Sequence, residues 1–236
     1  MTEPTRVSSL AITAQLSKMA ASTAKARVDG SLSPEQVQQF HQDGYLLIPN
    51  FFDTAEPLRR ARELVSTFDL AEHSMTKFTD DLDDDVPSSY FLGSAHKVRC
   101  FLEEGAIGTD GKLKRPQDLA VNKVGHALHV HDPVFHALSF SQCLQHLARS
   151  LGAHKDPRVL QSMVICKPLA IGGAVSHHND STFLYSAPPS AMASGSSWRT
   201  APNRTVVSAS FQGFTALARP RTRPLKDPDL WIETLQ

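Results

Sequence analysis

The chain has 236 residues and a mass of 25.8 kDa, which is the size of one domain with a substantial hydrophobic core. Its 24 Lys and Arg residues balance 24 Asp and Glu residues, so no net charge draws it to nucleic acid or an anionic membrane. No apolar run is long enough to span a membrane. Cys100, Cys143 and Cys166 are too few and too widely spaced for a disulfide framework. They predict a reducing compartment, for which we take the cytoplasm, with the peroxisome and the mitochondrion as alternatives.

The first part of the chain predicts a leader, a helix, a strand and a second helix. Residues 1–30 are rich in Ser, Thr and Ala, which predicts a disordered leader rather than a secretory signal. The Ser-Pro-Glu-Gln sequence at 33–36 is typical of a helix start with a capping box, and Gly44 predicts its end. A short apolar strand follows at 45–48, and a second helix is predicted from residue 53 or 54 to about residue 68.

The middle of the chain predicts strands on either side of one helix. Residues 96–102 are typical of a strand. Asp132 followed by Pro133 predicts the start of a helix that extends to about residue 151. Residues 159–165 and 174–185 predict two further strands. The folded domain is thus expected within residues 31–185.

The C-terminal stretch has a different composition. Residues 186–236 are rich in Ser, Pro, Ala and Arg, and a strand period is present only within 204–211. This composition predicts a disordered tail.

A His-x-Asp sequence at 178–180 suggests half of a metal site. Side chains two residues apart on a strand point to the same face, so His178 and Asp180 can reach one ion while Asn179 points away. An imidazole together with a carboxylate suits Fe(II). His177 has the opposite parity, and on spacing alone a polar strand end is the commoner explanation of such a sequence.

A second group of histidines raises an alternative. His126, His129 and His131 lie within six residues, which suggests a zinc site and a zinc hydrolase. On a strand, His129 and His131 share a face and His126 does not, and Asp132 is better used as a helix cap. The other interpretation is that these histidines line a pocket or pack beneath it.

Six short segments, in order along residues 31–185, resemble the phytanoyl-CoA dioxygenase family. The resemblance is strongest to the phytanoyl-CoA dioxygenase domain-containing proteins. The six segments are Leu32–Gln36, Asp43–Leu46, Asn122–His129, His131–Phe135, Gln161–Met163 and His178–Asp180. The family consists of Fe(II)- and 2-oxoglutarate-dependent oxygenases built on a double-stranded β-helix. The resemblance therefore implies a mixed α/β fold with a mostly β, jelly-roll core and N-terminal helices.

The same resemblance implies a site. By it, His178 and Asp180 are iron ligands, and Lys123 and Met163 contact the co-substrate 2-oxoglutarate. A lysine is suited to this role as a point cation beside a dicarboxylate. The resemblance further implies a small-molecule or acyl substrate that becomes hydroxylated, with ascorbate as an additional reductant.

The family pattern stops after Tyr185. All eleven histidines lie at or before His178, so the last 58 residues cannot supply a further iron-binding histidine. The genetic code allows the family sequence in another frame: from the last base of the Met192 codon, residues 192–202 permit Gly-Leu-Trp-Ile-Val-Leu-Glu-Asp-Cys-Thr. We therefore predict a frameshift, retained intron or gene-model error between Tyr185 and Met192, which leaves the β-helix incomplete and impairs activity. The alternative is a truncated product without enzymatic function.

Overall fold

The computed structural model describes residues 29–70, 89–166, 184, 190–197, 204–209 and 231–234. For residue 197 and for the last two ranges it describes the backbone only. Among the described residues, every helix is too short or too polar to cross a lipid bilayer.

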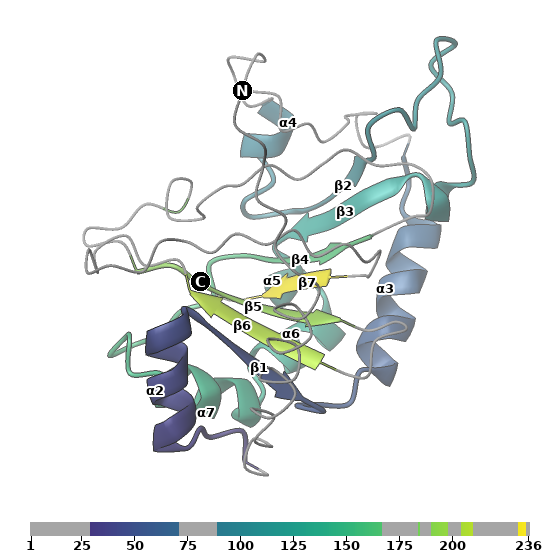
Figure 1. Cartoon of the computed structure of the whole chain (residues 1–236). Coiled ribbons are helices and arrows are strands. Elements are labelled where there is room, and N and C mark those ends of the chain that lie inside the picture. Colours follow the sequence, from purple (N-terminus) through teal and green to yellow (C-terminus); the bar gives the residue numbers. More distant parts are fainter. Residues whose placement is uncertain are drawn as a thin grey trace, which may run out of the picture.

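Seven strands form one antiparallel sheet in the order β1-β6-β5-β7-β4-β3-β2 (Figure 1). The strands are β1 (Tyr45–Pro49), β2 (Val98–Leu102), β3 (Val121–His126), β4 (Ser162–Ile165), β5 (Met192–Ser197), β6 (Arg204–Ala209) and β7 (Trp231–Thr234). The helices are α2 (Pro34–Asp43), α3 (Ala55–Thr67), α4 (Ser89–Leu92), α5 (Leu128–His131), α6 (Pro133–Ser139) and α7 (Gln142–Ser150), with a 3-10 helix η1 at Gln117–Leu119. The predicted mixed α/β class is confirmed. All described strands belong to this one sheet, so the double-stranded β-helix stays a prediction.

The predicted start and end of α2 are confirmed. The Ser33 hydroxyl accepts a hydrogen bond from the backbone N–H of Gln36, and the Gln36 side chain accepts one from the backbone N–H of Ser33. Gly44 ends the helix with a φ of 75°, a left-handed conformation that glycine adopts without strain. The strand and the helix predicted next are β1 and α3.

The single helix predicted from Asp132 onward is two helices. Asp132 caps α6 as predicted, because its carboxylate accepts hydrogen bonds from two backbone N–H groups of the first turn. A second cap, the Ser141 hydroxyl, accepts from the backbone N–H of Leu144 and starts α7. The apolar periodicity continues across the break, which is why the sequence pattern alone merges the two helices.

Three strands lie inside the C-terminal stretch that the sequence predicts to be disordered. Strands β5, β6 and β7 occupy the centre of the sheet between β1 and β4. Strands pair through backbone N–H and C=O groups, so a segment with weak side-chain periodicity can still add to a sheet. The strand predicted at 174–185 lies outside the described residues, apart from residue 184.

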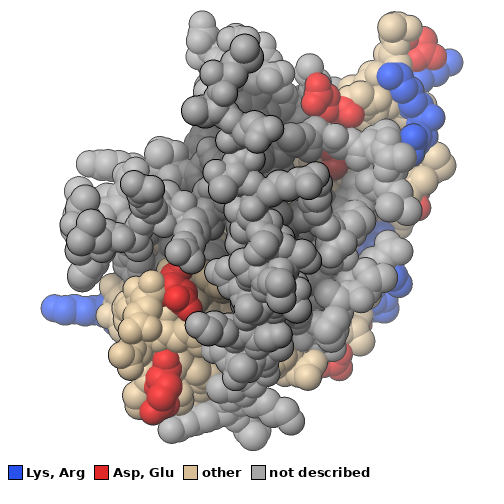
Figure 2. Space-filling model, in the orientation of Figure 1, with Lys and Arg blue, Asp and Glu red and all other residues tan. Residues whose placement is uncertain are grey.

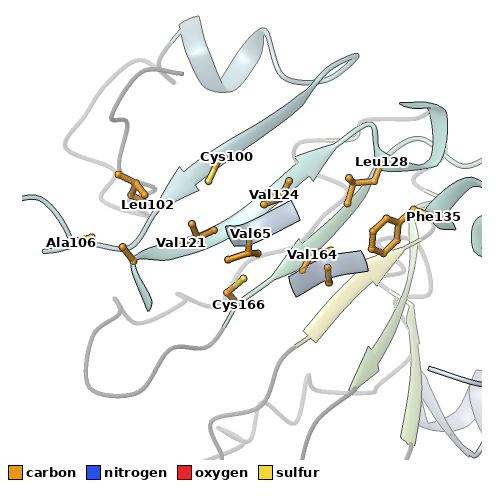
Figure 3. Packing of buried hydrophobic residues seen from close by; sticks show 12 residues of the cluster. Val65, Cys100, Leu102, Ala106, Val121, Val124, Leu128, Phe135, Val164 and Cys166 are labelled. Carbon is orange, nitrogen blue, oxygen red and sulfur yellow. The ribbon is translucent and has the colours of Figure 1, made fainter. Parts of the chain in front are cut away.

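Two hydrophobic clusters hold the elements together. The first lies between α3, α6 and strands β2 to β4, and Figure 3 shows its side chains. Its buried members are Ala61, Val65, Cys100, Leu102, Ala106, Ala120, Val121, Val124, Leu128, Phe135, Val164 and Cys166. The second joins α2 and α7 to β1 and β5 around Phe40, which is fully buried. Leu138 packs against both clusters and links them.

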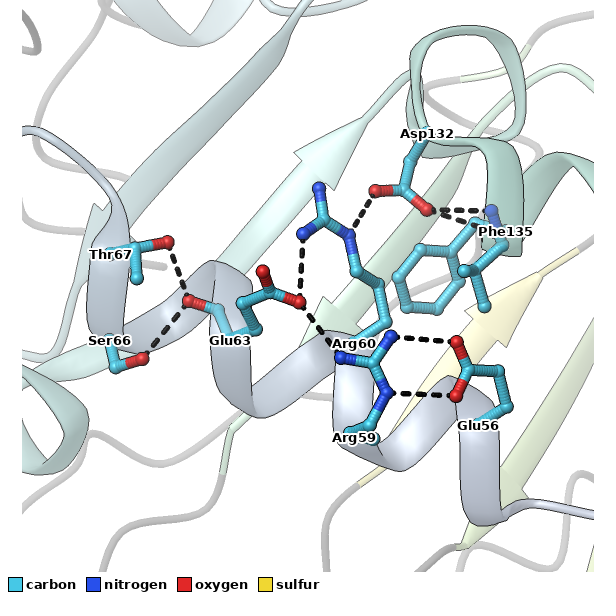
Figure 4. Close-up of polar contacts among 9 residues, drawn as sticks. Glu56, Arg59, Arg60, Glu63, Ser66, Thr67, Asp132 and Phe135 are labelled. Atoms are coloured by element: carbon cyan, nitrogen blue, oxygen red, sulfur yellow. Dashed lines mark hydrogen bonds and ion pairs between the residues drawn. The ribbon is translucent and has the colours of Figure 1, made fainter.

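The outer surface of α3 carries a row of charged side chains, which Figure 4 shows. Arg59 lies between Glu56 and Glu63, with nitrogen–oxygen distances of 2.7 and 3.1 Å. Exposed pairs of this kind contribute little to stability. Elsewhere on the surface shown in Figure 2, acidic and basic side chains both occur among the described residues, in keeping with their equal numbers in the sequence.

Candidate functional site

Lys123 and Met163 lie on neighbouring strands and on the same face of the sheet. Lys123 is directly opposite Ile165 in the β3–β4 pair, and Met163 is directly opposite Gly125. Directly opposed residues in an antiparallel pair share a face, and so do residues two apart on one strand. The structure therefore brings together the two residues that the resemblance assigns to the co-substrate.

This face is separate from the first hydrophobic cluster because of a bulge between β2 and β3. The register shifts between Phe101 and Leu102, so that Phe101 pairs with Lys123 whereas Leu102 pairs with Val121. As a result Val121 and Val124 both reach the cluster although they are three residues apart, and Lys123 between them does not belong to it.

Lys123 and Met163 are both buried, with exposed fractions of 9% and 4%. A buried ammonium group is stable only when acceptors or an anion surround it. Lys123 thus gives this face a positive charge in a site of reduced dielectric, where a carboxylate is bound more strongly than at the surface.

Gly125 allows β3 and β4 to approach closely at Met163. A Cβ atom placed on Gly125 would lie 2.8 Å from the Cβ of Met163, which is closer than real Cβ contacts. Glycine within a strand often marks such an approach of a neighbouring chain segment. Gly125 therefore helps to set where the Met163 side chain lies.

Aromatic side chains cover the same face next to Lys123. The Phe101 ring contacts Tyr90 and Phe91 of α4, with ring centroids 5.3 and 6.0 Å away. The Arg99 guanidinium lies 4.3 Å from the centroid of the Tyr90 ring and donates a hydrogen bond to the Tyr90 carbonyl. Burial raises the pKa of Tyr90, so its hydroxyl stays protonated and donates to the backbone carbonyl of Cys100 at 3.0 Å.

The histidines weighed as a zinc site have three different partners. His126 Nδ1 lies 2.7 Å from the Ser94 hydroxyl, and His129 Nδ1 lies 2.8 Å from the Ser162 hydroxyl. His131 is exposed, and its Nε2 lies 2.9 Å from the backbone carbonyl of His96. Across the described part of the chain, no group of three or more His, Cys, Asp or Glu side chains is arranged to hold a metal ion. The zinc site is therefore not formed by these residues.

His126 is the most strongly perturbed of these histidines. It is 4% exposed, and burial, together with the positive charge of Lys123, lowers its pKa from 6.5 to about 4. The imidazole is consequently neutral at physiological pH. The resemblance assigned no role to this residue, and Ser94, which anchors its ring, has no signal in the sequence.

The two candidate iron ligands, His178 and Asp180, lie outside the described residues. All four candidate residues fall within the part of the chain that matches a family model. The model describes phytanoyl-CoA dioxygenase (PhyH) and matches residues 40–210. The chain belongs to the phytanoyl-CoA dioxygenase family.

Individual members of this family show the extent of the similarity. The chain is 42% identical over 164 residues to phytanoyl-CoA dioxygenase domain-containing protein 1 of Rattus norvegicus, a match covering 66% of the chain and 56% of the relative. It is 43% identical over 166 residues to a phytanoyl-CoA dioxygenase of Arabidopsis thaliana, covering 69% and 58%. For phytanoyl-CoA dioxygenase 1 of Oryza sativa the identity is 44% over 165 residues, covering 68% and 57%. The chain thus spans little more than half the length of the curated relatives it matches.

Proposed function

We propose that this member of the phytanoyl-CoA dioxygenase family derives from an Fe(II)- and 2-oxoglutarate-dependent dioxygenase built on a double-stranded β-helix. The observation that carries the proposal is the shared, buried face of Lys123 and Met163 on strands β3 and β4. A buried lysine beside an apolar thioether suits a ligand with a carboxylate at one end and a short carbon chain. 2-Oxoglutarate has this chemistry.

In this proposal His178 and Asp180 hold iron, and Lys123 and Met163 hold the co-substrate. Bound iron supplies the activation of dioxygen, which couples oxidative decarboxylation of 2-oxoglutarate to hydroxylation of a small-molecule or acyl substrate. The residues of the chain contribute by positioning. Lys123 orients a carboxylate, Met163 packs against the carbon chain, and the rings of Phe101 and its neighbours exclude water from the charged group.

We further propose that the chain with its present C-terminal sequence is impaired. Two histidines and one carboxylate on one face are the usual ligands of this class of iron site, and the last 58 residues contain no histidine. This favours a second candidate, a product of the altered reading frame without enzymatic function. A frameshift between Tyr185 and Met192 would replace the last part of the family's domain by the present C-terminal sequence, and it would thereby account for the missing histidine. The match to the family model nevertheless extends to residue 210.

Two preparations test these proposals, the unaltered chain and a version whose reading frame is corrected at Met192. Each is incubated with Fe(II), ascorbate and labelled 2-oxoglutarate, and succinate is measured. We expect no turnover from the unaltered chain and turnover from the corrected version. In the corrected version, His178→Ala is expected to abolish succinate formation, while His177→Ala, the matched neighbour, retains it.

Three results would count against the proposals. A corrected protein that neither binds iron nor forms succinate would remove the oxygenase function. Turnover by the unaltered chain would refute its impairment. A continuous transcript that encodes residues 185–192 as in the present sequence, with no second transcript that restores the family sequence, would refute the frameshift.

A further inference from the structure

The tautomer of His126 is determined by its contact with Ser94. The Ser94 hydroxyl donates its single proton to the backbone carbonyl of Phe91, at an oxygen–oxygen distance of 2.5 Å. At its 2.7 Å contact with His126, Ser94 must therefore act as the acceptor. The proton of the neutral imidazole is consequently on Nδ1, and Nε2 carries a lone pair.

The surroundings of His126 keep this arrangement in place. Ser94 and His126 are 1% and 4% exposed, so water has little access to their hydrogen bond. The ring packs against Phe91 and Phe101, with centroids 5.4 and 5.5 Å away. The described residues offer no hydrogen-bond partner to its Nε2.

Lys123 and His126 are three residues apart on β3, and both are neighbours of Phe101. Phe101 is the residue directly opposite Lys123 in the β2–β3 pair, and its ring is the one that packs against His126. The charge of Lys123 is also near enough to oppose protonation of the ring. Among the described residues, Arg99 and Tyr90 also lie at this aromatic layer, where the Arg99 guanidinium packs over the Tyr90 ring and donates to the Tyr90 backbone carbonyl.

We propose that His126 is a positioning residue for Lys123, and that in the co-substrate complex its Nε2 accepts a hydrogen bond from the Lys123 ammonium. An ammonium group has three N–H donors, so one directed at His126 leaves others for a carboxylate. A protonated imidazole would instead repel the lysine and offer no acceptor. The role toward a carboxylate rests on the proposed function, whereas the coupling of the two side chains does not.

Nitrogen-15 NMR of the full chain with labelled histidine tests the coupling directly. His126→Gln identifies the His126 signals by their loss, and the nitrogen shifts of the unmodified chain report the tautomer without any substitution. We expect the Nδ1-protonated form. Ser94→Ala is expected to lose this single tautomer, and Ser94→Thr, which keeps the hydroxyl, to retain it.

The charge of Lys123 is tested by the pKa of His126. Lys123→Met is expected to raise that pKa by about half a unit or more, because a neighbouring positive charge disfavours imidazolium. Lys112→Met, which removes an exposed loop lysine, is expected to leave it unchanged. An Nε2-protonated ring in the unmodified chain, or an unchanged His126 pKa in Lys123→Met, would overturn the proposal.

Titration with 2-oxoglutarate separates this inference from the proposed function. We expect 2-oxoglutarate to shift the His126 signals in the frame-corrected chain and not in the same chain with Lys123→Met. We also expect the dissociation constant of 2-oxoglutarate to rise about tenfold in His126→Phe, because Lys123 loses one hydrogen-bond acceptor for its charged group. In His126→Gln, which keeps an acceptor, the rise is expected to be smaller. No response to 2-oxoglutarate in the frame-corrected chain would contradict the proposed function, whereas the tautomer and the pKa of His126 in the unmodified chain decide its coupling to Lys123.

Discussion

Arg60 and Asp132 lie 72 residues apart in the sequence, yet the Arg60 Nε donates a hydrogen bond to Asp132 Oδ2 over 2.7 Å (Figure 4). The other carboxylate oxygen, Oδ1, accepts from the backbone N–H groups of Val134 and Phe135 and caps α6. One carboxylate, only 4% exposed, therefore both starts α6 and attaches it to α3. Figure 4 shows this pair beside the other charged side chains of α3, and Asp132 is its buried member.

Loss of Arg60 is expected to destabilise the protein. In Arg60→Met the Asp132 carboxylate stays buried but loses a charged donor, which costs about 1–3 kcal/mol of unfolding free energy. Arg59→Met is the matched control on the preceding position of the same helix, where the side chain is 60% exposed and its ion pairs are solvated. We expect a change below about 0.5 kcal/mol for the control. Urea denaturation measures both, and equal effects would contradict the distinction between the buried and exposed pairs.

The burial of His126 predicts a specific dependence of stability on pH. Its pKa is about 4 in the folded chain and 6.5 when unperturbed, so between these values the unfolded chain binds a proton that the folded chain does not. The stability contribution linked to His126 is therefore fully present above pH 6.5, and it is lost progressively as the pH decreases toward 4. The loss from this residue amounts to about 3 kcal/mol.

His126→Gln provides the check on this assignment. The variant cannot titrate at this position, so its unfolding free energy is expected to fall less steeply between pH 6.5 and pH 4. The unmodified chain, measured in parallel, defines the original slope. If His126→Gln kept the original slope, a group other than His126 would be responsible for the pH dependence.

The cysteines are expected to differ in reactivity. Burial raises the pKa of Cys100 to about 12, so almost none of it is thiolate at neutral pH, and the thiolate is the reactive form. Cys166 is buried as well, whereas Cys143 is partly exposed. Alkylation of the native chain with iodoacetamide, followed by mass spectrometry, is expected to modify Cys143 first. Cys143→Ser should remove this fast reaction, and early modification of Cys100 would show that its strand opens readily.

Features determined by neighbouring residues were predicted from the sequence. The capping box of Ser33 and Gln36, and the cap at Asp132, involve residues two or three positions apart, so their signals lie within one short segment. The shared face of Lys123 and Met163 was not derivable in this way, because it depends on the register of two strands. The family resemblance supplied that pair before the geometry was known.

Features that depend on distant segments were missed. The bulge at Phe101 and Leu102, the partner of Arg60 and the break of the long helix before Ser141 leave no periodic pattern. Strands β5 and β7 lie outside 204–211, the one part of the C-terminal stretch with a strand period, whereas β6 lies within it. All three form by pairing with strands from the first part of the chain or with each other. A pairing of this kind is a property of the whole sheet and not of the segment itself.

Gly125 offers a test of whether strand packing positions the candidate co-substrate site. In Gly125→Ala the new Cβ would lie 2.8 Å from the Cβ of Met163, and both atoms are attached directly to the backbone, so no flexible side chain can move aside. Overpacking of this kind costs about 1–3 kcal/mol of unfolding free energy, and β4 must shift to relieve it. Because the shift carries Met163 with it, we expect 2-oxoglutarate to bind more weakly as well, which calorimetric titration measures.

Gly105→Ala is a suitable control for Gly125→Ala. Gly105 has a φ of 75°, so alanine is strained there, but no atom lies within 4 Å of the added Cβ. This control should lose stability without losing affinity for 2-oxoglutarate. If both variants lost affinity in proportion to their stability, the effect would come from general loosening of the fold. A loss confined to Gly125→Ala would instead identify the close approach of β3 and β4 as the feature that holds Met163 in place.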